Sequence, residues 1–106
     1  MAAYGTISAD ELNDRLGEVE LFDVRGPAET DRGVIEGAEL VPLHMVPLNV
    51  DRFRSDRDVV IYCHSGARSA QACLFLLRQG VENVYNLEGG ILHWAGSGLP
   101  LVPPDE

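Results

Sequence analysis

Residues 58–69, with the sequence DVVIYCHSGARS, constrain this chain more than any other segment, because a strand, a tight loop and the start of a helix follow one another within them. The apolar run 59–62 is typical of a parallel strand that is covered on both faces. Cys63 follows this run directly, and a helical pattern over 69–79 follows the loop and stops at Gly80. We therefore expect Cys63 at the carboxyl end of a strand, at the base of a loop that leads into a helix.

The loop after Cys63 has the composition of an anion-binding site. Backbone N–H groups converge in a loop that leads into a helix, and the helix adds the positive end of its dipole. These surroundings, with Arg68 as a nearby cation, favour the thiolate form of a cysteine, which is its nucleophilic form. Gly66 permits a turn that a side chain would hinder, and the small Ser65 and Ala67 leave the rim open. Cys63 is therefore the candidate catalytic residue, and the candidate substrate-binding residues are His64, Ser65, Gly66, Ala67 and Arg68.

The motif Cys-x-x-Gly-x-Arg after an apolar strand resembles the active loop of rhodanese-type sulfurtransferases. Further pieces of that family's pattern follow in the right order, at 21–25 (LFDVR), 35–38 (IEGA), 87–94 (LEGGILHW) and 98–100 (GLP). Each piece is weak alone, but together they are fairly specific. One departure is Val34, where the family commonly has a histidine; it removes a polar contact near the sheet and does not touch the cysteine. The resemblance implies a single-domain rhodanese over residues 1–106, in which Cys63 carries sulfur as a persulfide.

Apolar strands alternate with helical segments along the chain. We expect strands near 20–24, 39–41, 59–62 and 83–87, and helices near 9–16, 27–32, 69–79 and 91–95. This alternation predicts an α/β fold, a mainly parallel sheet flanked by helices on both faces, with the ligand at the carboxyl ends of the strands. The resemblance implies the same rhodanese-like architecture. Ser8 and Glu11 predict a capping box at the start of the first helix.

Net charge and cysteine content indicate which kinds of partner and which cellular compartment to expect. The 106 residues carry 17 acids against 8 basic side chains, all of them arginine, for a net charge of -9. An acidic surface argues against nucleic acid and against anionic membranes as partners, and favours a protein partner with a basic face. Residues 1–5 lack the features of a signal peptide, and no stretch reaches transmembrane length. Two cysteines in such a chain indicate free thiols in a reducing cytoplasm.

Several residues outside the loop have both a chemical and a structural interpretation. Asp23 and Arg25 end a strand and could act as a catalytic acid and base, but we favour a structural tie to neighbouring loops. The resemblance to the rhodanese family implies that this region lies close to the active loop, so a supporting role at the site is a further alternative. Cys73 could be a resolving cysteine, but a buried inert thiol is favoured because it shares a helical face with Ala70, Leu74 and Leu77. His64 either tunes the thiol and the donor preference or is an exposed rim residue without a role.

Four further segments have structural interpretations. Residues 44–49 are expected to form an irregular helical segment in the pocket wall, and 51–58, with alternating charges, a solvated face. Residues 88–90 are expected to make a close turn beside the active loop. Trp94 is expected to pack in the core.

The leading functional hypothesis is an enzyme that transfers sulfane sulfur without a cofactor. The Cys63 thiolate attacks the outer sulfur of thiosulfate or a persulfide, and cyanide, a small thiol or a protein cysteine then removes the carried sulfur. A sulfur-relay module that delivers persulfide sulfur to a carrier protein is the alternative from another class. A phosphatase is a weaker alternative, because the related phosphatase loops have five residues between cysteine and arginine and this loop has four. No metal site is expected, since His44, His64 and His93 lack ligand spacing with the cysteines.

Overall fold

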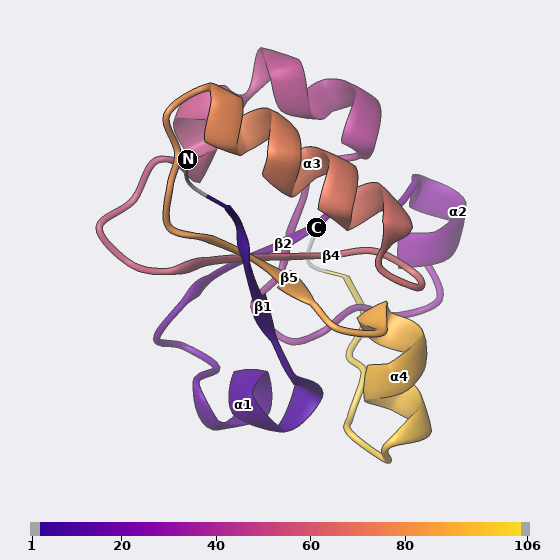
Figure 1. Ribbon diagram of the computed structural model, residues 1–106. Coiled ribbons are helices and arrows are strands. Elements are labelled where there is room, and N and C mark those ends of the chain that lie inside the picture. The colour runs from indigo at the N-terminus through magenta and orange to yellow at the C-terminus, as the bar shows by residue number, and fades with distance from the viewer. Residues whose placement is uncertain (1–2, 105–106) are drawn as a thin grey trace.

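The computed structural model describes residues 3–104 and has a five-stranded sheet with helices on both faces (Figure 1). The strands are β1 (Gly5–Ile7), β2 (Glu20–Asp23), β3 (Glu39–Leu40), β4 (Val59–Tyr62) and β5 (Val84–Leu87). They pair in the order β1-β5-β4-β2-β3, and every neighbouring pair is parallel. The helices are α1 (Ala9–Asp14), α2 (Pro27–Thr30), α3 (Ala67–Arg78) and α4 (Gly90–Gly96), with 3-10 segments η1 (Leu43–Leu48) and η2 (Val50–Phe53). The predicted α/β fold is confirmed.

Strand β4 lies in the middle of the sheet and is buried on both faces. Val59 and Ile61 pack into the core cluster that includes residues of α3, η1 and η2. Val60 and Tyr62 pack into the opposite cluster, which includes residues of α1 and α4. Figure 1 shows these two helical layers above and below the sheet. A strand covered on both faces needs apolar side chains at every position, which accounts for its continuous apolar run.

The predicted elements are present, with small differences in their boundaries. The strand predicted at 59–62 has those bounds, and the other three predicted strands are each one residue shorter. The four predicted helices differ by one or two residues at one or both ends. The capping box is confirmed: the Glu11 N–H donates to Ser8 Oγ at 3.1 Å, and the Ser8 N–H donates to Glu11 Oε1 at 2.9 Å.

The edge strand β1 is an element that the sequence analysis does not predict. It has only three residues, Gly5 to Ile7, and one of them is a polar threonine. Its partner β5 is distant in the chain, with Gly5 beside Tyr85 in the register. A Cβ atom at Gly5 would overlap the Tyr85 ring, so the glycine lets the ring lie across the strand. So short a run carries little periodicity of its own, and distant pairing defines it.

The buried face of α3 also differs from the predicted one. The buried side chains are Ser69, Ala72, Cys73 and Leu76. Cys73 is buried as expected, but Leu74, which was expected on the same face, is 44% exposed. The helix carries two overlapping sets of residues at helical spacing. Packing against the sheet selects the set that directs Ser69 inward, toward the end of β4.

The segment 51–58 is not wholly solvated, as its charges had suggested. Phe53 is fully buried, and its ring centroid lies 4.2 Å from that of Phe22 on β2. Its charged neighbours remain at the surface. The prediction is therefore wrong for Phe53, because one aromatic side chain in a polar segment can reach the core when the backbone forms a tight 3-10 turn.

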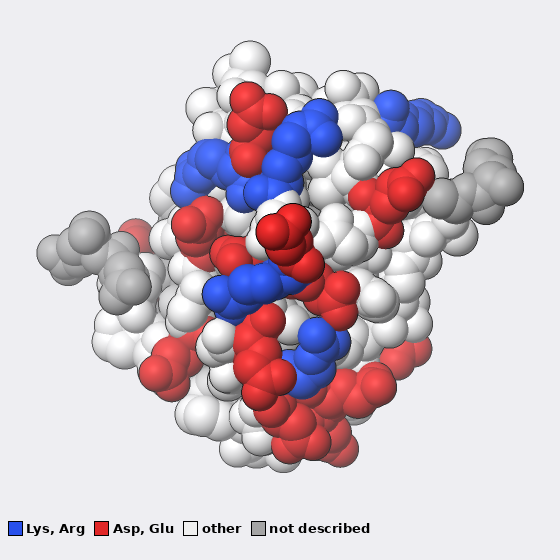
Figure 2. All heavy atoms as spheres, turned by 90° about the vertical axis from the view of Figure 1, so that its left-hand side faces the viewer, with Lys and Arg blue, Asp and Glu red and all other residues white. Residues whose placement is uncertain are grey.

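Arginine and acidic side chains intermingle on the face away from the loop that follows β4. Figure 2 shows this face, which lies on the left of Figure 1, with red and blue groups interspersed. Arg57 donates to the carbonyl oxygens of Gly17, Glu18 and Val19. Arg15 pairs with Asp58 at 3.0 Å. The viewed face is therefore a charge mixture without a continuous basic patch. No helix within residues 3–104 is long and apolar enough to span a membrane.

Candidate active site

Cys63 is the first residue after β4 and lies at the carboxyl edge of the sheet. Its carbonyl oxygen accepts a hydrogen bond from the Ile91 N–H at 2.9 Å, and that of His64 accepts one from the Leu92 N–H at 3.0 Å. These bonds attach the start of the loop to the first turn of α4. Cys63 is 1% exposed, so the loop that follows it controls access to the sulfur.

The Cys63 sulfur is surrounded by hydrogen-bond donors. The Gly66 N–H donates to Sγ at 3.1 Å, the Ser69 N–H at 3.4 Å and the Ser69 hydroxyl at 3.3 Å. Burial alone would raise the pKa of the Cys63 thiol. The hydrogen bonds from Ser69 and from the N–H groups of Gly66 and Arg68 outweigh burial and hold this pKa below its usual value. The sulfur is thus placed and activated as a nucleophile.

Two glycines with positive φ allow the loop to close around the sulfur. Gly66 has φ +114° and immediately precedes α3, which begins at Ala67 rather than at the predicted residue 69. Gly90 has φ +61°, and a Cβ atom there would overlap the carbonyl groups of Cys63 and His64. The expected close turn at 88–90 is therefore present, and its role is to bring α4 against the backbone of the loop.

A contact between α3 and β5 orients the group that supports the sulfur. Ser69 Oγ lies 2.5 Å from Asn86 Oδ1, and Asn86 Nδ2 donates to the Gly66 carbonyl oxygen at 3.2 Å. Asn86 is the register partner of Ile61 in β4, and this pairing places the Asn86 side-chain amide beside the loop. Ser69 and Asn86 are not predicted as site residues from the sequence. The nearest signal is the position of Ser69 directly after Arg68.

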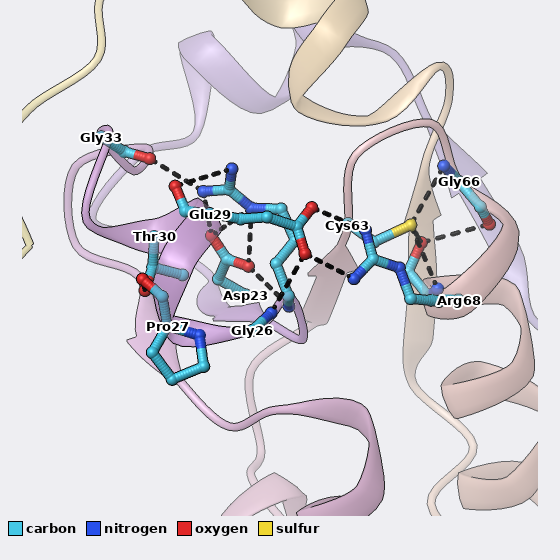
Figure 3. Close-up of polar contacts among 11 residues, drawn as sticks. Asp23, Gly26, Pro27, Glu29, Thr30, Gly33, Cys63, Gly66 and Arg68 are labelled. Carbon is cyan, nitrogen blue, oxygen red and sulfur yellow. Dashed lines mark hydrogen bonds and ion pairs between the residues drawn. The ribbon is translucent and has the colours of Figure 1, made fainter.

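Arg68 does not stand free at the end of the loop. Its two terminal nitrogens donate to the two carboxylate oxygens of Glu29 on α2, each at 2.8 Å (Figure 3). This bidentate pair lowers the pKa of Glu29 to about 2, chiefly through the hydrogen bonds from Arg68. The sequence predicts Arg68 as a cation near Cys63; the structure adds that a carboxylate 39 positions away in the chain balances the charge of its guanidinium.

Asp23 and Arg25 form a buried ion pair beside the Glu29–Arg68 pair. Arg25 Nη2 donates to Asp23 Oδ2 at 2.7 Å, and the two side chains are 6% and 0% exposed. Arg25 also donates to the carbonyl oxygens of Gly33 and Glu29. Burial opposes the charge on Arg25, but the Asp23 carboxylate outweighs it and raises the pKa of the guanidinium. The pair connects the end of β2 to the following turn. A supporting role of Asp23 and Arg25 at the active site stays a proposal.

The remaining candidate residues form the rim of the loop. His64, Ser65 and Ala67 are exposed, and Gly66 is half-buried. Among residues 3–104 no group of three or more His, Cys, Asp or Glu side chains is arranged to hold a metal ion. The segment expected in the wall of the active pocket forms η1, and with α3 it lines a cavity of about 210 Å³ that includes no residue from 63 to 68. Its place in the active pocket stays a prediction.

The second cysteine lies away from the rim. Cys73 is 0% exposed and belongs to the core cluster under α3. Burial raises the pKa of its thiol to about 12. Both cysteines are free thiols. The arrangement favours the interpretation of Cys73 as a packing residue.

Trp94 is likewise fully buried, as expected for a core residue, and its Nε1 donates to the Pro100 carbonyl oxygen at 2.9 Å.

Comparison with known proteins identifies relatives over nearly the whole chain. The family model described as a rhodanese-like domain matches residues 8–97. A protein named sulfurtransferase from Allochromatium vinosum is 48% identical over 102 residues, which cover 93% of this chain and 95% of that protein. MoeZ of Mycobacterium tuberculosis, named a probable adenylyltransferase/sulfurtransferase, is 38% identical over 89% of this chain but only 26% of its own length. The crystal structure of a rhodanese-related protein from Thermoplasma volcanium superposes with a TM-score of 0.86 at 31% identity, over 93% of this chain and 98% of that one.

Proposed function

Because the chain belongs to the rhodanese-like domain family, we propose that it is a sulfurtransferase in which Cys63 carries sulfane sulfur as a persulfide. One observation carries the proposal: at the end of β4, the Cys63 sulfur accepts hydrogen bonds from Gly66 and Ser69. These donors stabilise negative charge on sulfur, and both the attacking thiolate and an ionised persulfide carry such charge. We also propose that residues 1–106 act as one domain.

The reaction divides into two sulfur transfers. In the first, the Cys63 thiolate attacks the outer sulfur of the donor, a new S–S bond forms, and the donor's S–S bond breaks. Thiosulfate would leave as sulfite, and a persulfide would leave as a thiolate. In the second, cyanide or a thiol attacks the outer sulfur on Cys63 and regenerates the thiolate. The first step raises Cys63 to the persulfide level at the expense of the donor, and the second step restores the thiolate, so the complete cycle leaves the protein unchanged.

Three further features of the chain support particular details of the proposal. The exposed rim residues His64, Ser65 and Ala67 leave the loop open to donors and acceptors. His64 lies beside the nucleophile, and we propose it as a residue that contacts the donor. Two free thiols suit a reducing compartment, so we propose a cytoplasmic location.

Delivery to a carrier protein is a second candidate for the acceptor half of the reaction. Leu92 is 57% exposed, and its N–H group bonds to the His64 carbonyl oxygen, so an apolar side chain lies next to the loop. MoeZ, whose name joins an adenylyltransferase to a sulfurtransferase, contains a segment similar to this chain. A persulfide relay to a partner protein would use the same Cys63 chemistry, and measured transfer rates would separate it from turnover with small acceptors.

The phosphatase alternative receives less support from the site. A phosphate ester carries two negative charges, and phosphatase chemistry needs an arginine that is free to bind its oxygens. Both terminal nitrogens of Arg68 instead contact Glu29. The ring of the loop, with four residues between Cys63 and Arg68, is also small for a phosphate group.

The direct test is intact-mass measurement after incubation with a sulfur donor. The wild-type protein should gain the mass of one sulfur atom on Cys63 and lose it when cyanide or a thiol is added. Cys63→Ser should gain none, whereas the matched variant Cys73→Ala should load as the wild type does. Sulfur gain by Cys63→Ser, or hydrolysis of aryl phosphates without sulfur gain by the wild type, would contradict the proposal.

A further inference from the structure

We infer that Glu29 makes this site selective for persulfide donors, R–S–SH, over thiosulfate, because it neutralises the arginine of the active loop. The inference rests on the proposed function and narrows its donor class. It follows from the placement of charge around Cys63.

Glu29 occupies the guanidinium of Arg68 from one side. Arg68 contacts both Glu29 oxygens at 2.8 Å, so its two terminal nitrogens face a carboxylate (Figure 3). Glu29 Oε1 also accepts a hydrogen bond from the Gly26 N–H at 3.3 Å, which fixes the carboxylate on α2. A donor anion would have to compete with an ionised carboxylate that is already held in place.

The neighbouring guanidinium, that of Arg25, is also engaged by a carboxylate. Arg25 is engaged by Asp23 at 2.7 Å and by the carbonyl oxygens of Gly33 and Glu29. Among residues 3–104, both guanidinium groups of this network are therefore balanced by a carboxylate. The remaining attraction for an anion comes from backbone N–H groups of the loop, and two of these, those of Gly66 and Ser69, already donate to the Cys63 sulfur.

Thiosulfate and the Cys63 thiolate carry charges of the same sign. When the Cys63 thiolate meets thiosulfate, three negative charges gather in the loop, and the chain as a whole carries a net charge of -9. Like charges that approach in a partly desolvated site repel strongly, and the field of the whole protein adds to this repulsion. A protonated persulfide brings no charge at its reacting sulfur, so only the charge of the thiolate must be accommodated.

The persulfide reaction balances without a further reagent. The thiolate of Cys63 attacks the outer sulfur of R–S–SH, the bond between the two donor sulfurs breaks, and the hydrogen stays on the transferred sulfur. The products are Cys63–S–SH and R–S⁻, which carry the same total charge as the reactants. Loop N–H groups can then stabilise the ionised persulfide on Cys63.

The experiment measures the loading rate of Cys63 by rapid-quench intact mass with thiosulfate, with glutathione persulfide and with persulfidated serum albumin. It is run at pH 6 and at pH 8, and variants are compared at the same pH, because a persulfide is a stronger acid than a thiol and only its protonated form brings no charge to the reacting sulfur. The readout is the ratio of the thiosulfate rate to the glutathione persulfide rate. Because this ratio is compared between variants, the intrinsic reactivity of the donors cancels. The albumin arm distinguishes a protein persulfide from a small one.

Glu29→Gln should raise the ratio by about five-fold or more, since it leaves the positive charge of Arg68 unbalanced while an amide oxygen can still accept one of its hydrogen bonds. Glu29→Asp keeps the charge and should leave the ratio near that of the wild type. Glu82→Gln removes an exposed carboxylate at the amino end of β5 and is the matched control. Added salt should accelerate thiosulfate loading of the wild type more than persulfide loading, because it screens repulsion.

The outcomes separate the two claims. If none of the donors adds sulfur to Cys63, the proposed function fails and the inference fails with it. If Cys63 is loaded but Glu29→Gln leaves the ratio unchanged, or lowers both rates equally, the sulfurtransferase reading stands and the selectivity assigned to Glu29 is wrong. A ratio that rises in Glu82→Gln as much as in Glu29→Gln would also overturn the inference, because net charge alone would explain it.

Discussion

The Ser69 hydroxyl lies 3.3 Å from the Cys63 sulfur, and the two residues are six positions apart in the chain. Ser69 is fully buried, and its Oγ also lies 3.2 Å from the Gly66 carbonyl oxygen and 2.5 Å from Asn86 Oδ1. A hydroxyl has one hydrogen and can donate to one acceptor at a time. When Cys63 is ionised, the charged sulfur is the strongest of these acceptors, so Ser69 supports the thiolate selectively.

Removal of this hydroxyl should make Cys63 harder to ionise. In Ser69→Ala the backbone N–H groups and the burial remain, but the side-chain hydrogen bond is lost, so the pKa of Cys63 should rise. Hydrogen bonds to charged groups contribute roughly 1.5–3 kcal/mol, so iodoacetamide labelling at pH 7 should slow by about ten-fold or more. The measurement is the labelling rate against pH. Ser97→Ala, at the exposed end of α4, is the control and should not shift the profile; an unchanged Ser69→Ala profile would contradict the assignment.

The two cysteines should differ sharply in reactivity. Burial raises the pKa of Cys73 to about 12, whereas that of Cys63 lies below its usual value. Native protein should therefore be alkylated at Cys63 and only slowly at Cys73, as peptide mapping by mass spectrometry would show. Cys73→Ser should destabilise the fold by about 1–3 kcal/mol more than Cys73→Ala, because a hydroxyl would be buried without a hydrogen-bond partner. Rapid labelling of Cys73, or a Cys63–Cys73 disulfide during turnover, would show that it has a chemical role.

The Glu29–Arg68 pair should contribute stability in a pH-dependent way. The pKa of Glu29 falls from 4.5 to about 2 in the folded chain, mainly because of its hydrogen bonds with Arg68. A carboxyl group with a lowered pKa stabilises the folded state above its unfolded pKa, and this contribution is lost as the pH falls from about 4.5 toward 2. Both side chains are more than a third exposed, so the contribution at pH 7 should be about 1 kcal/mol or less.

Urea unfolding of wild type and Glu29→Gln at pH 7, 4 and 3 measures this effect. The difference in the free energy of unfolding should be constant at neutral pH and should shrink as the pH falls through this range. Glu82→Gln serves as the reference, since its carboxylate is exposed. A difference that stays constant down to pH 3 would show that the ion pair does not act as described.

The close approach of α4 to the active loop should make Gly90 intolerant of a side chain. Gly90→Ala would need a positive φ and would press a Cβ atom against the Cys63 and His64 carbonyl groups, so we expect a loss of more than about 2 kcal/mol. Gly96, in the same helix, has open space around it. Gly96→Ala should therefore be neutral or stabilising by about 0.5–1 kcal/mol. Thermal unfolding of both variants tests the pair, and equal melting temperatures would refute the packing argument.

Local sequence determined the elements that short-range interactions define. The capping box at Ser8 and Glu11, the apolar β4 and the place of Cys63 after it could all be predicted, because each depends on residues within a few positions of one another. The order of strands and helices also followed from the sequence, since it depends on the alternation of periodic segments. Resemblance to rhodanese-type sulfurtransferases supplied the same architecture, which the comparisons then showed.

Tertiary structure alone decided which groups meet at the sulfur. Glu29 reaches Arg68 because α2 follows β2 and β2 pairs directly with β4, so residues distant in the chain share one edge of the sheet. Asn86 reaches Ser69 for the same reason, through the pairing of β5 with β4. Sequence alone indicated a cation at the loop but not its carboxylate partner, because a charge on a distant segment leaves no signal in the local pattern. The chain's own residues at 63–68 specify a nucleophile, and the packing of parallel strands specifies the charge that surrounds it.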